Sequence, residues 1–330
     1  MGSGAVRSDL RTLISSSEVW FSILSRAGAA LLILYCVWLL SQRGIPTIST
    51  FVDHTAHMYK AYLASIGEVR AVHWNDENVF LVGPVPYSVL WGFTRFLSFD
   101  VAYRVAYVLI LLMLVLLSYN YPEFTVPFVT VYGIGSVIVG RFPGLLAYLF
   151  GALALILFRS RRYLLSAVMG SLAVLSEPAD AILYVLFLAG LAVDELRKDR
   201  RSLFALFPAV LLGVYGIVLM LAFPHSASVV RATLFSGVTA QSTLRLVLVL
   251  ANTIPILLFA GTFSVLLWKR LRIASLVLLG LVAYFLAGWA FLPASFPLAK
   301  VWPLSYVIFF TFGYFLYLRP FCVSRCSFET

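Results

Sequence analysis

The chain has 330 residues, of which 62% are hydrophobic and only 12% are charged. This composition excludes an ordinary soluble domain, because the outside of a soluble fold must face water and so much apolar surface could not be hidden. The net charge of +10 does not indicate nucleic-acid binding, since the basic residues form short clusters between apolar stretches and no basic–aromatic recognition motif is present.

The pattern predicts an all-α, polytopic transmembrane helical bundle. A span requires about 20 apolar residues, and roughly ten stretches approach that length. No small-residue cleavage site follows the first of them, so we expect it to be a retained span and not a signal peptide. The ten stretches are 20–42, 83–98, 101–119, 143–159, 163–177, 179–194, 203–223, 244–268, 272–291 and 300–318.

The basic residues predict the orientation, since cytoplasmic loops are rich in Lys and Arg. We expect the cytoplasm to hold both termini, the 319–330 tail, Arg95 and Arg104, and the clusters within 159–162, 197–201 and 269–272. The connections on the other side are then 43–82, 120–142, 177–180, 224–243 and 292–299. This orientation requires that 120–142, which is rich in Pro and Gly, be re-entrant or lie on the surface without crossing as a full span.

The first outer connection, 43–82, contains three of the four histidines of the chain. If 52–66 is helical, Asp53 and His57 lie on one face with Lys60 beside them, and Tyr59 and Tyr62 form a side that can rest on the membrane. A carboxylate held at a membrane surface has a raised pKa and can accept a proton from a substrate hydroxyl. The loop is therefore a candidate site of acid–base chemistry.

These residues resemble the GT-C superfamily of integral membrane glycosyltransferases. The resemblance covers roughly residues 20–200 and is carried by three groups of residues. In the first outer loop they are Asp53-His54, His57, Gly67, His73-Trp74 and Gly83-Pro84-Val85-Pro86-Tyr87; further on they are Gly140-Arg141-Phe142-Pro143-Gly144 and Leu175-Ser176-Glu177-Pro178. The sequence departs from the family where His54 replaces the usual second acid, and it has no large C-terminal soluble domain.

The resemblance implies transfer of a sugar from a polyprenyl-phosphate carrier to a glycan, lipid or protein acceptor outside the cytoplasm. Asp53 would be the catalytic base or would help to hold a divalent metal ion, although no cofactor is certain. The lipid phosphate would need cations on the outer side. The expected substrate-binding residues are His54, His57, His73, Trp74, Glu177, Arg141, Arg231, Arg245 and Lys300.

Each of these residues also has a simpler interpretation. Asp53 is placed to cap a helix, His54 and His57 can make surface polar contacts instead of binding a metal, and Trp74 is typical of an interfacial anchor. Arg141 can pair with Glu123, Asp180 can cap the next span, and Arg231 and Arg245 can bind lipid headgroups.

Two other function classes remain open. One is a non-catalytic multi-pass scaffold or assembly partner. The other is a transporter, which is disfavoured because the apolar stretches carry few ionisable residues near their centres.

Overall fold

The computed structural model describes residues 3–42, 52–68, 83–129, 131–222, 268, 271–277 and 279–280. Within these ranges every regular element is helical. The chain begins with the long helix α1 (Ser3–Ser41) and the short helices α2 (Val52–Ser65) and α4 (Val85–Thr94), and continues through α5 (Phe99–Asn120) and α6 (Val131–Val139). It then forms α7 (Phe142–Arg159), α8 (Tyr163–Val174), α9 (Pro178–Glu195) and α10 (Phe207–Ala222).

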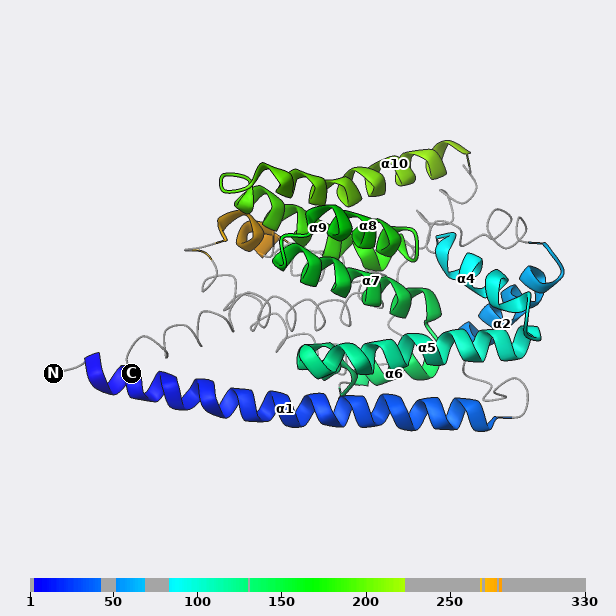
Figure 1. Cartoon of the computed structure of the whole chain (residues 1–330), viewed down its shortest axis with the longest axis horizontal. Coiled ribbons are helices and arrows are strands. Elements are labelled where there is room, and N and C mark those ends of the chain that lie inside the picture. Colours follow the sequence, from blue (N-terminus) through cyan, green and yellow to red (C-terminus); the bar gives the residue numbers. More distant parts are fainter. Residues whose placement is uncertain are drawn as a thin grey trace, which may run out of the picture.

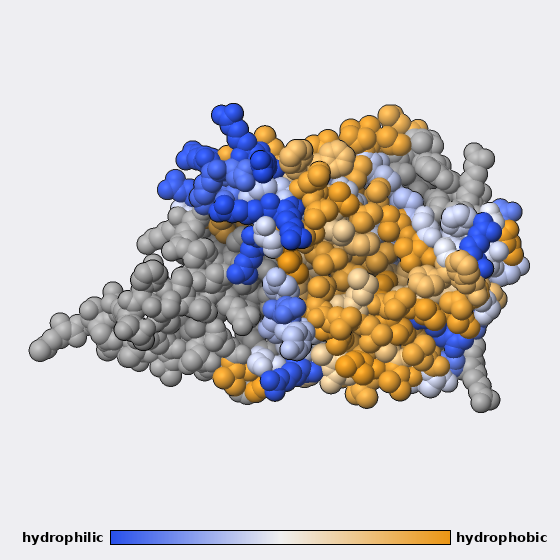
Figure 2. Space-filling model, in the orientation of Figure 1, coloured by the Kyte–Doolittle hydropathy of each residue, from blue (hydrophilic) through white to orange (hydrophobic). Residues whose placement is uncertain are grey.

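Four helical segments of the described chain are long and apolar enough to cross a membrane: Ser22–Ser41, Phe99–Asn120, Phe142–Arg159 and Arg200–Val218. They correspond to four of the expected spans. The surface between the two ends of the molecule is a broad hydrophobic band (Figure 2), as expected for helices that face lipid. The length and composition of these helices indicate a helical membrane protein.

The other expected spans either differ from the prediction or lie wholly or mostly outside the described residues. The 83–98 stretch forms only α4, which has 10 residues and at 1.5 Å per residue is about 15 Å long. The 163–177 stretch forms the 12-residue α8. The 179–194 stretch matches α9, but α9 carries three acidic residues. All of 300–318, nearly all of 244–268 and most of 272–291 lie outside the described residues.

The helices share one polar end, which we call the α2 end because α2 and α4 lie across it (Figure 1). Helix α5 begins there, since Phe99 contacts Tyr62 of α2 with their ring centres 5.5 Å apart. Helix α7 begins there as well, since the ring centres of Phe142 and His57 are 6.2 Å apart. Helices α5 and α7 therefore run in the same direction.

The connection between α5 and α7 must carry the chain back to the α2 end. It consists of the 3-10 helices η1 (Pro122–Phe124) and η2 (Val126–Val129), followed by α6. Thr125 is hydrogen-bonded to Ser25 near the start of the α1 span, whereas Gly140 lies against His54 at the α2 end. Residues 120–142 therefore run from one end of the helical bundle to the other, contrary to the expectation that this segment does not cross. The segment has to cross because the 83–98 stretch, which was expected to be a span, does not. How 120–142 lies relative to a membrane stays a prediction.

Arg95 and Arg104 were expected on the cytoplasmic side, opposite to the outer connection 43–82. This prediction is wrong, because both arginines lie at the same end as the start of that connection. Arg104 donates a hydrogen bond to the carbonyl oxygen of Gln42, directly after α1. Arg95 ends α4 and lies four residues before the start of α5. Both arginines therefore lie at the α2 end, because α4 lies across that end and does not cross the bundle.

Basic residues gather at the opposite end, which we call the basic end. The α7–α8 turn and the segment after α9 meet there. That segment forms the 3-10 helix η3 (Arg200–Leu206), which packs on α8 and α9, and its Ser202 donates a hydrogen bond to the carbonyl oxygen of Ala192. The upper left of Figure 2 shows this hydrophilic region. Its exposed basic residues are Arg159, Arg161, Arg162, Arg197, Lys198, Arg200, Arg201 and Arg272.

Candidate functional site at the α2 end

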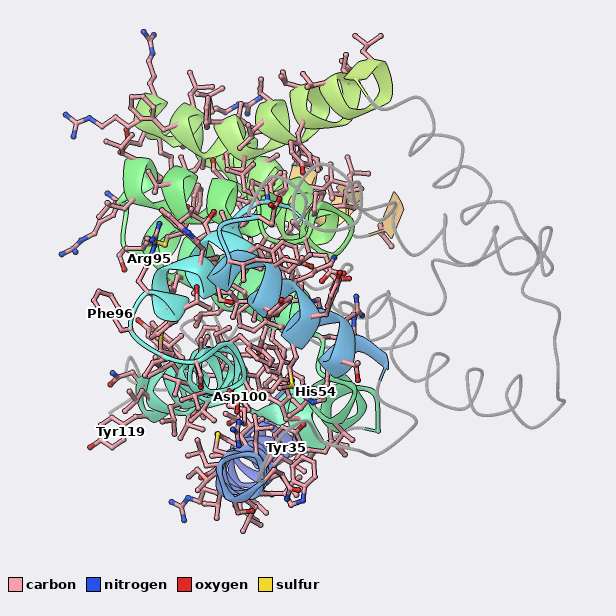
Figure 3. All side chains as sticks on the ribbon, turned by 90° about the vertical axis from the view of Figure 1, so that its right-hand side faces the viewer. Tyr35, His54, Arg95, Phe96, Asp100 and Tyr119 are labelled. Atoms are coloured by element: carbon pink, nitrogen blue, oxygen red, sulfur yellow. The ribbon has the colours of Figure 1, made fainter. Side chains whose placement is uncertain are left out.

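The candidate site is built on α2, which begins at Val52. Asp53 is in its first turn, and the side chain of Asp53 lies outside the described residues. The next residue, His54, is fully buried beneath the helix. The helix is therefore held at the end that carries Asp53, and Figure 3 views the bundle from this side.

Three tyrosines surround His54. Its Nε2 is 2.7 Å from the hydroxyl of Tyr35 on α1, and its Nδ1 is 2.5 Å from the hydroxyl of Tyr103 on α5. The Tyr107 ring packs edge-on, with its centre 5.4 Å from that of the imidazole. The tyrosines at 103 and 107 share a face of α5 because they are four residues apart. His54 thus ties α2 to α1 and α5.

Burial lowers the pKa of His54 to about 4. The imidazole is therefore neutral near pH 7, with one ring nitrogen that donates and one that accepts. The tyrosine hydroxyls are able to serve either nitrogen. The histidine that was expected to contact substrate is thus a buried connection between helices.

His57 is one turn further along the same face and is also buried. Its Nδ1 is 3.4 Å from the hydroxyl of Tyr87 on α4, and Lys60 donates to the same hydroxyl at 3.0 Å. Burial, together with the nearby positive charges of Lys60 and Arg141, lowers the pKa of His57 to about 3. This contact fastens the middle of α2 to α4.

Close to His57 lies a cluster of three charged residues, the half-buried Arg141 and the buried Glu177 and Asp180. The Nη2 atom of Arg141, just before α7, is 2.7 Å from Oε1 of Glu177 and 3.2 Å from Oδ2 of Asp180. The three side chains are 19%, 10% and 8% exposed. The expected partner of Arg141 was Glu123, whose side chain is outside the described residues; the structure pairs Arg141 with the acids that precede and begin α9.

The backbone explains why both carboxylates fit there. A Cβ atom added to Gly144 would lie 2.6 Å from one oxygen of Glu177 and 2.7 Å from one oxygen of Asp180. Only glycine allows this approach to the first turn of α7, where the positive end of the helix dipole favours negative charge. In the sequence Arg-Phe-Pro-Gly at 141–144, Arg141 thus supplies the cation, Phe142 and Pro143 begin the helix, and Gly144 leaves space for the two carboxylates.

One guanidinium faces two carboxyl groups in this cluster. Burial is the main cause that raises the pKa of Glu177 above its ordinary value of 4.5, and the Asp180 carboxyl adds to it, whereas Arg141 opposes both. Two close carboxylates cannot both ionise cheaply, so they tend to share a proton. The most stable protonation state of the cluster therefore has a proton shared by the two carboxyl groups. Their remaining negative charge compensates the positive charge of Arg141.

The remaining expected site residues cannot be placed beside these. His73, Trp74, Arg231, Arg245 and Lys300 lie outside the described residues. Among the side chains that are described, no group of three or more His, Cys, Asp or Glu is placed to hold a metal ion.

Sequence reasoning overlooked the tyrosines of the site. Tyr103 and Tyr107 were visible only as two aromatic residues four apart in an apolar stretch, and Tyr35 as one aromatic in the first span. Their spacing is compatible with a shared helix face, but nothing in the sequence indicates that a histidine lies beside them.

Comparisons of the chain with protein-family models, with curated proteins and with solved structures found no match.

Proposed function

We propose that the chain is a GT-C-like glycosyltransferase that transfers a sugar from a polyprenyl-phosphate carrier to an acceptor on the extracytoplasmic side. In this reaction Asp53 accepts the proton of an acceptor hydroxyl as its oxygen attacks the anomeric carbon. The bond between that carbon and the phosphate oxygen breaks, and the polyprenyl phosphate leaves.

The observation that supports this proposal best is the anchoring of α2 across the end of an apolar bundle. His54 holds the first turn of the helix at two hydrogen bonds, and His57 contacts Tyr87 one turn later. A base needs a fixed position relative to its substrate, and a rigid support for the residue next to it supplies this. The helix lies next to the hydrophobic band, where a lipid-linked donor would be found.

The buried acids add further support. Glu177 and Asp180 lie at the same end as α2 and hold a proton between them, so the α2 end contains both a candidate base and a protonated carboxyl group. Such a combination is common in acid–base enzymes. Arg141 is less suited to bind the donor phosphate than expected, because its charge is compensated by these acids.

Sugar transfer by purified protein tests the proposal. Asp53→Asn in liposomes that contain polyprenyl-phosphate mannose or polyprenyl-phosphate glucose is expected to lower transfer at least about a hundredfold, the usual contribution of a general base. Glu68→Gln is the matched control, because Glu68 is an exposed acid directly after the same helix. Equal transfer by Asp53→Asn and the wild type would remove the catalytic assignment.

A second candidate, a non-catalytic membrane scaffold, is favoured by one observation. Both ring nitrogens of His54 are engaged by tyrosines, as they would be in a purely structural contact. A scaffold predicts that wild-type protein transfers no sugar from either donor and that Asp53→Asn leaves its assembly with partners unchanged.

A further inference from the structure

The turn after α4 combines an exposed cation with exposed aromatic rings. The guanidinium of Arg95 lies over the Trp91 ring, 4.7 Å from its centre. Trp91 is 38% exposed, and Phe96, the next residue after Arg95, is 89% exposed. In the view along the bundle, Arg95 and Phe96 lie at its perimeter and away from its core (Figure 3).

Other described cations at the α2 end have their charges or donors engaged within the protein. Arg104 pairs with Asp100 at 2.7 Å, Arg141 pairs with Glu177, and Lys60 donates to Tyr87. Within the described ranges, no acidic side chain forms an ion pair with Arg95. Its positive charge is therefore directed outward.

The surroundings of Arg95 are those of a membrane interface. Trp side chains gather where the hydrocarbon region meets the headgroups, and Arg side chains at helix ends extend toward the same layer. Helix α4 lies where the hydrophobic band meets the α2 end. Stacking on Trp91 fixes the plane of the guanidinium while its edge N–H groups stay available, which is the arrangement that binds phosphate oxygens well. Phe96 then offers an apolar surface to the adjoining acyl chains.

We propose that Trp91, Arg95 and Phe96 form a binding site for the phosphate headgroup of an anionic membrane lipid. Arg95 donates to the phosphate oxygens, Trp91 orients the guanidinium, and Phe96 contacts the chain region below the headgroup. The site also explains why a basic residue is present at the end of the molecule opposite to the basic end. Lipid binding here is independent of sugar transfer, so it stands or fails separately from the glycosyltransferase proposal.

Native mass spectrometry of the full-length protein in detergent tests this site. The probes are phosphatidylglycerol, zwitterionic phosphatidylcholine and inorganic phosphate. The wild type is expected to retain phosphatidylglycerol in preference to phosphatidylcholine, and Arg95→Gln to lower its affinity about fivefold, as for the loss of one basic residue at an anionic lipid surface. Arg95→Lys keeps the positive charge but not the guanidinium group that stacks on Trp91, so its affinity for phosphatidylglycerol should lie between those of Arg95→Gln and the wild type.

The matched control is Arg159→Gln, which removes an exposed arginine at the basic end. It should bind phosphatidylglycerol as the wild type does. The proposal is overturned if Arg95→Gln binds phosphatidylglycerol as tightly as the wild type, or if Arg159→Gln loses as much. It is also overturned if phosphatidylcholine is retained equally or if inorganic phosphate displaces the lipid at equal concentration, since either result would exclude an anionic-lipid site.

Discussion

Arg141 and Glu177, which are 36 residues apart in the sequence, form a largely buried ion pair with 2.7 Å between Nη2 and Oε1. The pair joins the start of α7 to the turn before α9, so it fixes two helix beginnings at the α2 end. Breaking a buried pair from one side leaves an uncompensated charge, which costs more than the pair itself contributes.

Arg141→Met should therefore destabilise the protein by about 3–5 kcal/mol, because it leaves two carboxyl groups without their cation. The thermal unfolding midpoint in detergent measures the effect. Arg159→Met, at an exposed position, is the control and should change stability by less than about 0.5 kcal/mol. The double variant Arg141→Met/Glu177→Gln should recover part of the loss; an Arg141→Met midpoint equal to that of Arg159→Met would contradict the buried pair.

The same cluster predicts a pH dependence of stability. Burial, with the Asp180 carboxyl, raises the pKa of Glu177 in the folded protein above 4.5, so the folded state binds this proton more tightly than the unfolded state. The contribution of Glu177 to stability is therefore largest in acid. It decreases as the pH rises above 4.5 and levels off above the folded pKa.

Glu177→Gln, which is neutral at every pH, should lack this decrease. The difference in unfolding midpoint between Glu177→Gln and the wild type, followed from about pH 4 to about pH 9, should therefore grow with pH in favour of the variant. Comparing the two proteins at each pH cancels the opposite effect of His54, whose lowered pKa makes its contribution decrease as the pH falls below 6.5. A constant difference would show that Glu177 titrates normally.

Gly140 is predicted to tolerate no side chain. It has a φ angle of +82°, and a Cβ atom there would lie 2.4 Å from the His54 ring. Gly140→Ala combines a left-handed backbone with a clash in a packed site, and should cost about 2–4 kcal/mol. Gly135→Ala, within α6 where a Cβ meets nothing within 4 Å, should instead be neutral or stabilising by up to about 1 kcal/mol. Similar midpoints for the two variants would argue against the contact between Gly140 and His54.

His54→Phe should loosen α2 more than His57→Phe does. The first change removes the imidazole partner of the Tyr35 and Tyr103 hydroxyls, and the loss of such a buried partner costs about 1–3 kcal/mol. The second removes only the longer 3.4 Å contact with Tyr87. Hydrogen exchange of the backbone amides of 52–65 reports the opening of α2. Faster exchange in His57→Phe than in His54→Phe would show that the tyrosines are not the main anchor.

The sequence predicted the long helices well, because α1, α5 and α7 each carry an uninterrupted apolar stretch with the length of a membrane span. It misplaced α4 for a physical reason. An apolar stretch that lies across the end of a bundle has the same composition as one that crosses it, and only the contacts of α4 with α2 and α5 distinguish the two. The expected side of Arg95 and Arg104 changed with it.

The candidate site was predictable only in its local part. Asp53, His54 and His57 share one short segment, and their helix was expected from the sequence. The Tyr35–His54–Tyr103 contacts and the Arg141–Glu177–Asp180 cluster join residues between 19 and 49 positions apart. Such pairings depend on how helices pack, which a single sequence does not encode in any local pattern.

The central claim is that α2 and the basic end face opposite sides of the membrane, with α2 outside. Cysteine labelling of Ser65→Cys and Ser160→Cys, each in a chain whose native Cys36, Cys322 and Cys326 are replaced by Ser, tests it most directly. Ser65 is exposed at the end of α2, and Ser160 is exposed in the α7–α8 turn. A membrane-impermeant maleimide added to intact cells should label Ser65→Cys at once and Ser160→Cys only after permeabilisation; the reverse pattern, or labelling of both from one side, would contradict the account.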